Sequence, residues 1–208
     1  MASPRSTPRT LSRGDTGSFL LFMVAGVAIA GWAVVRSIGN IIAAVGNRDV
    51  RVPVEFLGTV AQAPIGPGGA LVPVQLTDAV VTAPSLPLAS LWALFLAEGL
   101  FAASVATVVT LLLVLCIGIL RGRIFSRRHT RLVAAAGVVS LIGAIGVPFF
   151  HNMVANGALA WLSERTYDRG LTQQIDLPVL IVIGFVAGLS STVFAVGDRL
   201  QRDTEGLV

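Results

Sequence analysis

Four ionisable side chains lie inside or beside long apolar runs of the sequence, where a charge is costly and therefore suggests a function. They are Arg36, Glu98, His151 and Asp176. A guanidinium, a carboxylate and an imidazole together provide ion pairing and proton transfer. With the neighbouring Asn152, they form a candidate polar site for a ligand or a proton. The alternative is a structural layer of ion pairs and solvated helix ends.

The spacing of the four ionisable residues predicts that they share one depth in a membrane. Each lies 20 to 23 residues from a charged residue at the other end of its apolar run: Arg36 from Asp15, Glu98 from Arg121, His151 from Arg131, and Asp176 from Arg199. A helix rises ~1.5 Å per residue, so each interval spans about the hydrocarbon core of a bilayer. Glu98 is therefore predicted in an outer polar rim. The helix interior below this rim is predicted to be uncharged.

Motifs for catalysis or cofactor binding fail on inspection. The run Gly188–Thr192 contains serines but lacks the second glycine of a nucleophile elbow. His129 and His151 are predicted at opposite ends of a span, so they do not share a metal. The turn Gly66–Gly69 contains a proline, which removes a donor that a phosphate cradle uses. We predict no enzyme activity, no cofactor and no metal, with a membrane enzyme as the third choice of function.

Composition indicates a membrane protein. The chain has 208 residues, of which 54% are hydrophobic and 12% are charged, against about 25% charged residues in soluble domains. The net charge of +4 comes from arginines at the borders of the apolar runs. Topology therefore explains this charge better than direct nucleic-acid binding does.

Four apolar segments are long enough to cross a bilayer as helices. They are predicted at about 18–38, 91–120, 132–150 and 177–196. The predicted fold class is membrane all-α, a four-transmembrane-helix bundle over residues 18–196. Residues 1–17 indicate a disordered tail, residues 197–208 form a polar C-terminal tail, and Pro148 is predicted at the end of the third span.

The segment between the first two spans alternates like a strand pair. Val50, Val52 and Val54 alternate with polar residues or proline, and a second alternating run follows the turn Gly66–Gly69. This pattern predicts a β-hairpin or small sheet at about 48–82, outside the membrane. A short amphipathic helix at the interface is predicted after the third span, from four apolar positions: Met153, Ala155, Leu159 and Leu162.

Small residues recur at four-residue spacing in several spans. Gly184 and Gly188 form a Gly-x-x-x-Gly pair, Gly26 precedes Ala30 by four residues, and Ala136 begins a similar series. Such stripes let helix backbones approach closely in lipid. They predict packing within the bundle, and self-association into a homo-oligomer is the alternative.

The distribution of arginine predicts the orientation. Ten arginines lie in the two tails and in the 121–131 loop, against five in the two longer outer segments. Basic residues favour the cytoplasmic face, so both termini are predicted in the cytoplasm. The 121–131 loop is suited to contact with anionic lipid headgroups or with a cytosolic partner.

The C-terminal segment combines a phenylalanine, a glycine, a leucine, acidic residues and an apolar end. These residues are Phe194, Gly197, Leu200, Asp203, Glu205, Leu207 and Val208. The pattern resembles the ending of a bacterial four-span membrane family of unassigned function, domain of unknown function twenty-nine seventy-five. The resemblance implies a long outer segment after the first span, and it supplies no activity and no catalytic residues. It also implies a regulatory partner, because some relatives are encoded beside a small helix-turn-helix regulator.

The function that this sequence predicts is contact with a partner protein at the bacterial cell membrane. The tail residues Leu200, Asp203, Glu205, Leu207 and Val208 are one candidate surface, and the outer hairpin is another. The tail has the alternative role of capping the fourth helix. A small oligomeric transporter or channel, built around the outer polar rim, is the alternative function.

Overall fold

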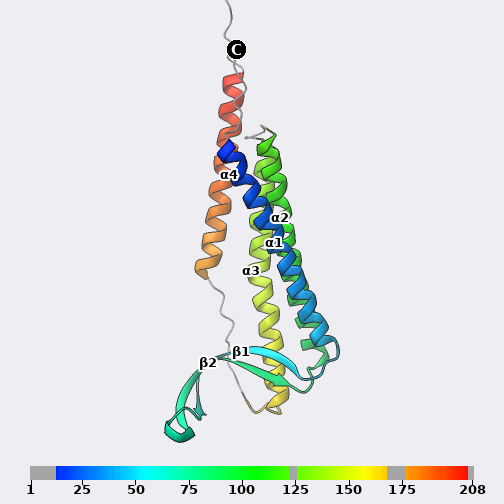
Figure 1. Cartoon of the computed structure of the whole chain (residues 1–208), viewed down its shortest axis with the longest axis vertical. Helices are drawn as coiled ribbons and strands as arrows, with labels where there is room; N and C mark the ends of the chain where they lie inside the picture. The colour runs from blue at the N-terminus through cyan, green and yellow to red at the C-terminus, as the bar shows by residue number, and fades with distance from the viewer. Residues whose placement is uncertain (1–12, 122–125, 168–176, 206–208) are drawn as a thin grey trace, which may run out of the picture. The chain divides into compact units, whose positions relative to one another are not determined.

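The protein has four long helices and one β-hairpin. Its computed structural model describes residues 13–121, 126–167 and 177–205. The elements follow in the order α1 (Arg13–Val45), β1 (Val50–Ala63), the 3-10 turn η1 (Pro67–Gly69), β2 (Val72–Ala83), α2 (Leu88–Leu120), α3 (Arg127–Leu162) and α4 (Leu177–Glu205) (Figure 1). Each α-helix contains a stretch long and apolar enough to cross a membrane. The predicted four apolar helices, with a hairpin between the first two, are confirmed.

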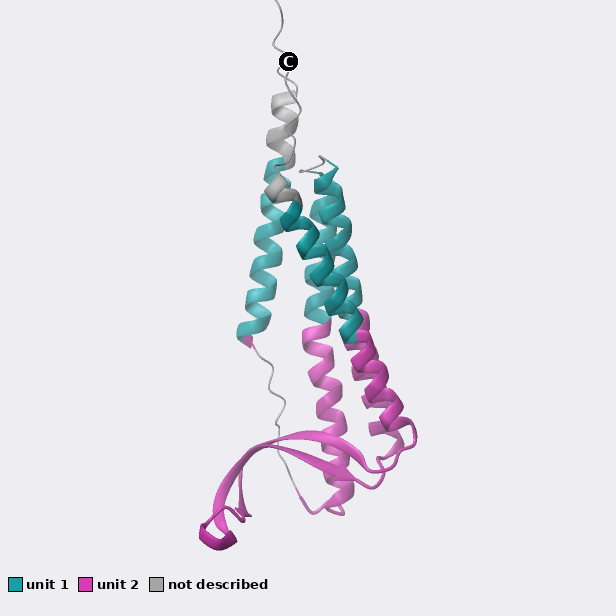
Figure 2. Cartoon of the chain, viewed as in Figure 1, with its two compact units in different colours: residues 1–33, 104–142, 178–208 teal, residues 34–103, 143–177 magenta. Residues whose placement is uncertain are grey.

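The chain divides into two compact units, which Figure 2 colours separately. Unit 1 comprises residues 1–33, 104–142 and 178–208, and it contains α4 with parts of α1, α2 and α3. Unit 2 comprises residues 34–103 and 143–177, and it contains the hairpin with the remaining parts of the same three helices. The described residues of the predicted outer rim, Arg36, Glu98, His151 and Asn152, belong to unit 2.

The hairpin of unit 2 pairs β1 with β2 in an antiparallel register. Val50 lies opposite Ala83 at its base, and Ala63 lies opposite Val72 near its turn. The register shifts between Glu55 and Thr59. Gly58 lies inside this bulge with a φ of 72°, a conformation that glycine adopts without a steric penalty. The predicted hairpin is therefore confirmed, with a bulge that divides it into two halves.

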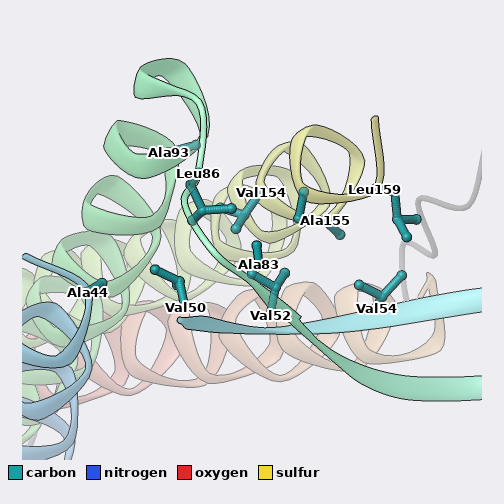
Figure 3. Close-up of a cluster of buried hydrophobic side chains, with 11 residues drawn as sticks. Ala44, Val50, Val52, Val54, Ala83, Leu86, Ala93, Val154, Ala155 and Leu159 are labelled. Atoms are coloured by element: carbon teal, nitrogen blue, oxygen red, sulfur yellow. The ribbon is translucent and has the colours of Figure 1, made fainter. Parts of the chain in front are cut away.

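The core of unit 2 lies between the base of the hairpin and the helices. Val52 and Val54 are 1% and 2% exposed. In Figure 3, valines of β1 point toward Val154, Ala155 and Leu159 of α3. Burying a valine side chain contributes roughly 1.5–3 kcal/mol, so this alternating face fixes the base of the hairpin firmly.

Helix α3 continues beyond the predicted end of its span. The separate amphipathic helix predicted after Phe150 is wrong, because α3 runs without interruption to Leu162. Val154 and Ala158 of this extension are buried in the core under the hairpin. Pro148 was expected at a span end, but it lies inside α3. It removes one backbone hydrogen bond there, and burial of the following turns stabilises the helix beyond it.

Small residues bring helices together at positions other than the predicted glycine pair. In unit 2, a Cβ at Gly157 of α3 would collide with the hydroxyl of Ser90 in α2. In unit 1, a Cβ at Gly137 of α3 would collide with Ala187 of α4. A Cβ at Gly184 or Gly188 meets nothing within 4 Å. The prediction that these two glycines pack within the bundle is therefore wrong for the described residues.

Two side chains tie loops to the hairpin of unit 2. The Asn47 amide donates to the backbone oxygen of Leu86 at 3.0 Å and accepts from the Leu86 N–H at 2.7 Å, which joins the two ends of the hairpin. The Tyr167 hydroxyl lies 2.8 Å from Thr59 Oγ1, and its ring contacts Phe56 edge-on. The chain that leaves α3 is thereby held at the bulge.

Candidate functional site

Glu98 of α2 is a buried carboxyl group in unit 2. Its side chain is 4% exposed. Ser37 Oγ donates to Glu98 Oε2 at 2.9 Å, and Asn40 Nδ2 donates to Glu98 Oε1 at 2.8 Å. Each carboxyl oxygen therefore has a donor from α1, which offsets part of the cost of removing this group from water. The contacts also join α1 to α2.

His151 of α3, another residue of the predicted rim, lies within electrostatic reach of Glu98 and of Arg36. The Arg36 guanidinium carbon lies 4.9 Å from the centroid of the Phe101 ring, in a cation–π geometry. Three helices thus contribute an arginine, a carboxyl group and an imidazole to one neighbourhood, which we call the Glu98 cluster: Arg36, Ser37, Asn40, Glu98 and His151.

The structure changes the interpretation of Glu98. Depth counting predicts a residue in a polar rim, above an uncharged interior. Glu98 is enclosed by protein within unit 2. Its depth in a membrane, and the uncharged interior below the rim, stay predictions. Counting residues gives a position along a helix axis, but it does not give the direction around the axis. The side chain of Glu98 is directed at polar residues of α1, and counting residues along the sequence cannot predict that direction.

Two other predicted site residues have different outcomes. Asn152 follows His151 on α3, and its Oδ1 atom is buried without a hydrogen-bond partner among the described residues. Asp176 lies outside the described residues. The structure therefore brings Arg36, Glu98 and His151 together, and it leaves the predicted participation of Asp176 untested.

Sequence reasoning missed Ser37 and Asn40, the two donors to Glu98. A signal for them was present, because Ser37, Asn40 and Ala44 recur at three- and four-residue spacing on one side of α1. Ser37 and Ala44 are both 2% exposed. A stripe of small and polar residues inside an apolar span indicates a helix contact, and the carboxyl group on the facing helix is the natural acceptor.

The C-terminal candidate surface begins as part of α4. Leu200, Asp203 and Glu205 belong to this helix, which ends at Glu205. Leu207 and Val208 lie outside the described residues. The predicted polar tail is therefore helical over residues 197–205, and its role in partner binding stays a prediction.

The Glu98 cluster has the groups needed to bind a cation or to exchange a proton. A carboxyl group, when ionised, attracts a positive charge, and an imidazole both accepts and donates protons. No group of three or more histidine, cysteine, aspartate or glutamate residues able to hold a metal occurs among the described residues.

Comparison with known proteins found no match to this chain among the family models, the curated proteins or the solved structures.

The first prediction concerns the hydrogen bonds of Glu98. We expect Glu98→Ala to destabilise the protein by about 1–3 kcal/mol, because it leaves the buried Ser37 hydroxyl and the Asn40 amide without their acceptor. We expect Glu98→Gln to cost less, since the amide keeps one acceptor oxygen and donates to the Ser37 hydroxyl. Thermal unfolding of the purified protein in detergent measures both.

Glu55→Ala is the control, because it removes an exposed carboxyl group from the same unit. It should leave the unfolding temperature unchanged or raise it slightly, because Glu55 lies opposite Asp78 in the strand register and the two carboxylates repel each other. Equal unfolding temperatures for Glu98→Ala and Glu55→Ala would show that the contacts of Glu98 do not stabilise unit 2.

Proposed function

We propose that this protein is a multi-pass protein of the bacterial cell membrane that acts by binding another protein through its hairpin. In this proposal the four spans form one bundle, both termini lie in the cytoplasm, and the hairpin lies on the opposite side. The arginine distribution supports that orientation. Membership of the four-span family that the C-terminal segment resembles, and a regulatory role, are parts of the same proposal.

The main support for this proposal is that the hairpin has one half anchored in the core and one half exposed. The base is fixed by buried Val52 and Val54. Beyond the bulge, Val60, Ile65 and Leu71 are 66%, 69% and 66% exposed. The turn of the hairpin lies apart from the helices of unit 2 (Figure 2). Exposed apolar side chains outside the apolar helices are typical of a protein-contact surface.

The backbone of the hairpin offers a second means of recognition. The sheet has only two strands, β1 and β2, so each strand has one edge that is unpaired within the sheet. An unpaired edge accepts an added strand from a partner, whose side chains then contact the exposed apolar residues. The contact of Tyr167 with Thr59 holds the bulge from which this outer half extends.

The charges on the hairpin indicate one property of the partner. Glu55 and Asp78 are both exposed and lie directly opposite each other in the strand register. Like charges at opposed positions are destabilising. A partner strand that brings a basic residue to this pair relieves the repulsion. We therefore expect a partner with apolar and basic residues.

The second prediction tests the hairpin as a contact surface. We expect a photo-crosslinking residue at Leu71, in the full chain in its native cells, to capture one specific protein that mass spectrometry identifies. We expect Val60→Asp to reduce this adduct about tenfold, because it places a charge in the apolar contact. The same crosslinker at Val186, an exposed position of α4, should not capture that protein.

Gln62→Asp is the matched control for Val60→Asp. Both positions are exposed, lie on the same strand and gain the same charge, but only Val60 is apolar. Capture of the same proteins from Leu71 and Val186 would contradict the proposal. An equal loss of the adduct in both aspartate variants would contradict the role of the apolar contact.

A small oligomeric transporter or channel is the second candidate, and the Glu98 cluster favours it. A buried carboxyl group with an imidazole and a guanidinium nearby is an arrangement suited to moving a proton or a cation. The open space at Gly184 and Gly188 leaves an approach for α4 of a second copy, which supports an oligomer.

The third prediction concerns ion flux through the protein, and it tests the transporter or channel candidate. Liposomes that contain the wild-type protein should pass protons or monovalent cations faster than protein-free liposomes. Glu98→Gln should lower that flux about tenfold, because it removes the buried carboxyl group that would bind the proton or the cation, while Glu55→Gln should not change it. A flux in wild-type liposomes equal to that in protein-free liposomes would exclude this candidate.

A further inference from the structure

A cavity lies in unit 1 where α2 ends and α3 begins. It has a volume of about 220 Å³. The polar part of its lining consists of Arg121, Ser126, Arg128 and His129, and the apolar part includes Val114, Ile117 and Leu132. The lining is therefore mostly apolar with two arginines among its residues, a combination that fits a ligand with a charged head and hydrocarbon.

The start of α3 adds positive potential to this cavity. Ser126 caps the helix, because its side-chain Oγ accepts from the N–H group of His129 at 3.3 Å. Helix N-termini carry a partial positive charge and favour anions. The first turn of α3 contains no acidic residue, and Arg127 and Arg128 begin the helix. An anion that binds beside these two arginines is attracted both by their charges and by the helix N-terminus.

The wall of the cavity is built by close packing. His129 is 3% exposed. A Cβ at Gly118 of α2 would collide with its imidazole ring, and the ring of Phe194 from α4 lies edge-on with a centroid distance of 6.2 Å. The backbone of α2 thus comes directly against the histidine. Because this packing fixes His129, the start of α3 is held beside the end of α2, and Arg121 and Arg128 line one cavity.

We propose that this cavity binds the phosphate group of a phosphate ester that carries a net negative charge, with Arg121 and Arg128 as its counter-charges. Arginine matches phosphate oxygens in charge and hydrogen-bond geometry. The apolar side chains Val114, Ile117 and Leu132 receive the ester carbons. The volume is below the ~300–1,000 Å³ of sites for drug-sized ligands, so it suits a headgroup phosphate. The apolar lining and the adjacent ends of two apolar helices favour an anionic lipid over a soluble phosphate.

This site is independent of the hairpin and of Glu98, since all of its residues belong to unit 1. It also differs from general attraction between a basic loop and a membrane surface. General attraction depends on the number of arginines. Binding in a defined cavity depends on which arginine is removed. Two substitutions that each remove one positive charge, one in the cavity lining and one outside it, therefore distinguish the two cases.

The fourth prediction uses native mass spectrometry of the full chain in detergent. The probes are phosphatidylglycerol and phosphatidylcholine with identical acyl chains. We expect the wild-type protein to retain one phosphatidylglycerol molecule in preference to phosphatidylcholine. Arg128→Gln should weaken this retention about tenfold, because it removes one charged hydrogen-bond donor from the phosphate. Arg121→Gln should act in the same way.

Arg131→Gln is the control, since Arg131 is exposed, lies on the same stretch of α3 and does not line the cavity. It should leave retention unchanged. Displacement of the bound lipid by millimolar inorganic phosphate would identify a soluble phosphate as a competing ligand of the same site, and resistance to it would identify the lipid as the ligand. Equal weakening by Arg128→Gln and Arg131→Gln, or equal retention of the two lipids, would overturn the proposal.

Discussion

Strand β1 buries only one face at the base of the hairpin, and the organisation of unit 2 depends on what covers that face. Val50, Val52 and Val54 turn one face into the core, while Arg51, Pro53 and Glu55 on the other face are exposed. The buried face requires an apolar surface against it. The last turns of α3 and the start of α2 provide that surface, so both helices extend beyond the length that an average bilayer core needs.

The anchored base and the Glu98 cluster act on the same helices. The base holds α2 and α3 through apolar burial, and Glu98 joins α2 to α1 through the hydrogen bonds from Ser37 and Asn40. A buried carboxyl group is costly without donors, so the cluster also restricts how α1 and α2 rotate against each other. Apolar packing therefore supplies stabilisation in unit 2, and polar contacts fix the facing sides of the helices.

The parts of the fold that depend on composition and period are predictable from the sequence. The four apolar helices follow from run length, and the hairpin follows from alternation at Val50–Val54 and Val72–Leu76. The continuation of α3 through Pro148 was not predictable in this way, because it depends on burial of Val154 and Ala158 by a distant hairpin. Local pattern carries no information about that partner.

The candidate site shows the same limit. The sequence identifies Arg36, Glu98 and His151 as unusual residues, and the structure places them in one neighbourhood. The burial of Glu98 and its donors depends on the rotation of α1 against α2. The predicted packing of Gly184 and Gly188 fails for a related reason, since α4 presents Ala187 to Gly137. Small-residue spacing marks a face that permits close approach, but the neighbouring helix determines which face is used.

The central claim is that the base of the hairpin is rigidly anchored while its outer half is available for contact. Hydrogen–deuterium exchange of the full chain in lipid nanodiscs tests this directly. We expect the amides of residues 50–55 and 79–83 to exchange at least about a hundredfold more slowly than those of residues 59–76, because opening the base requires exposing the core. Uniformly fast exchange along both strands would contradict the anchor, and uniformly slow exchange would contradict the exposed outer half.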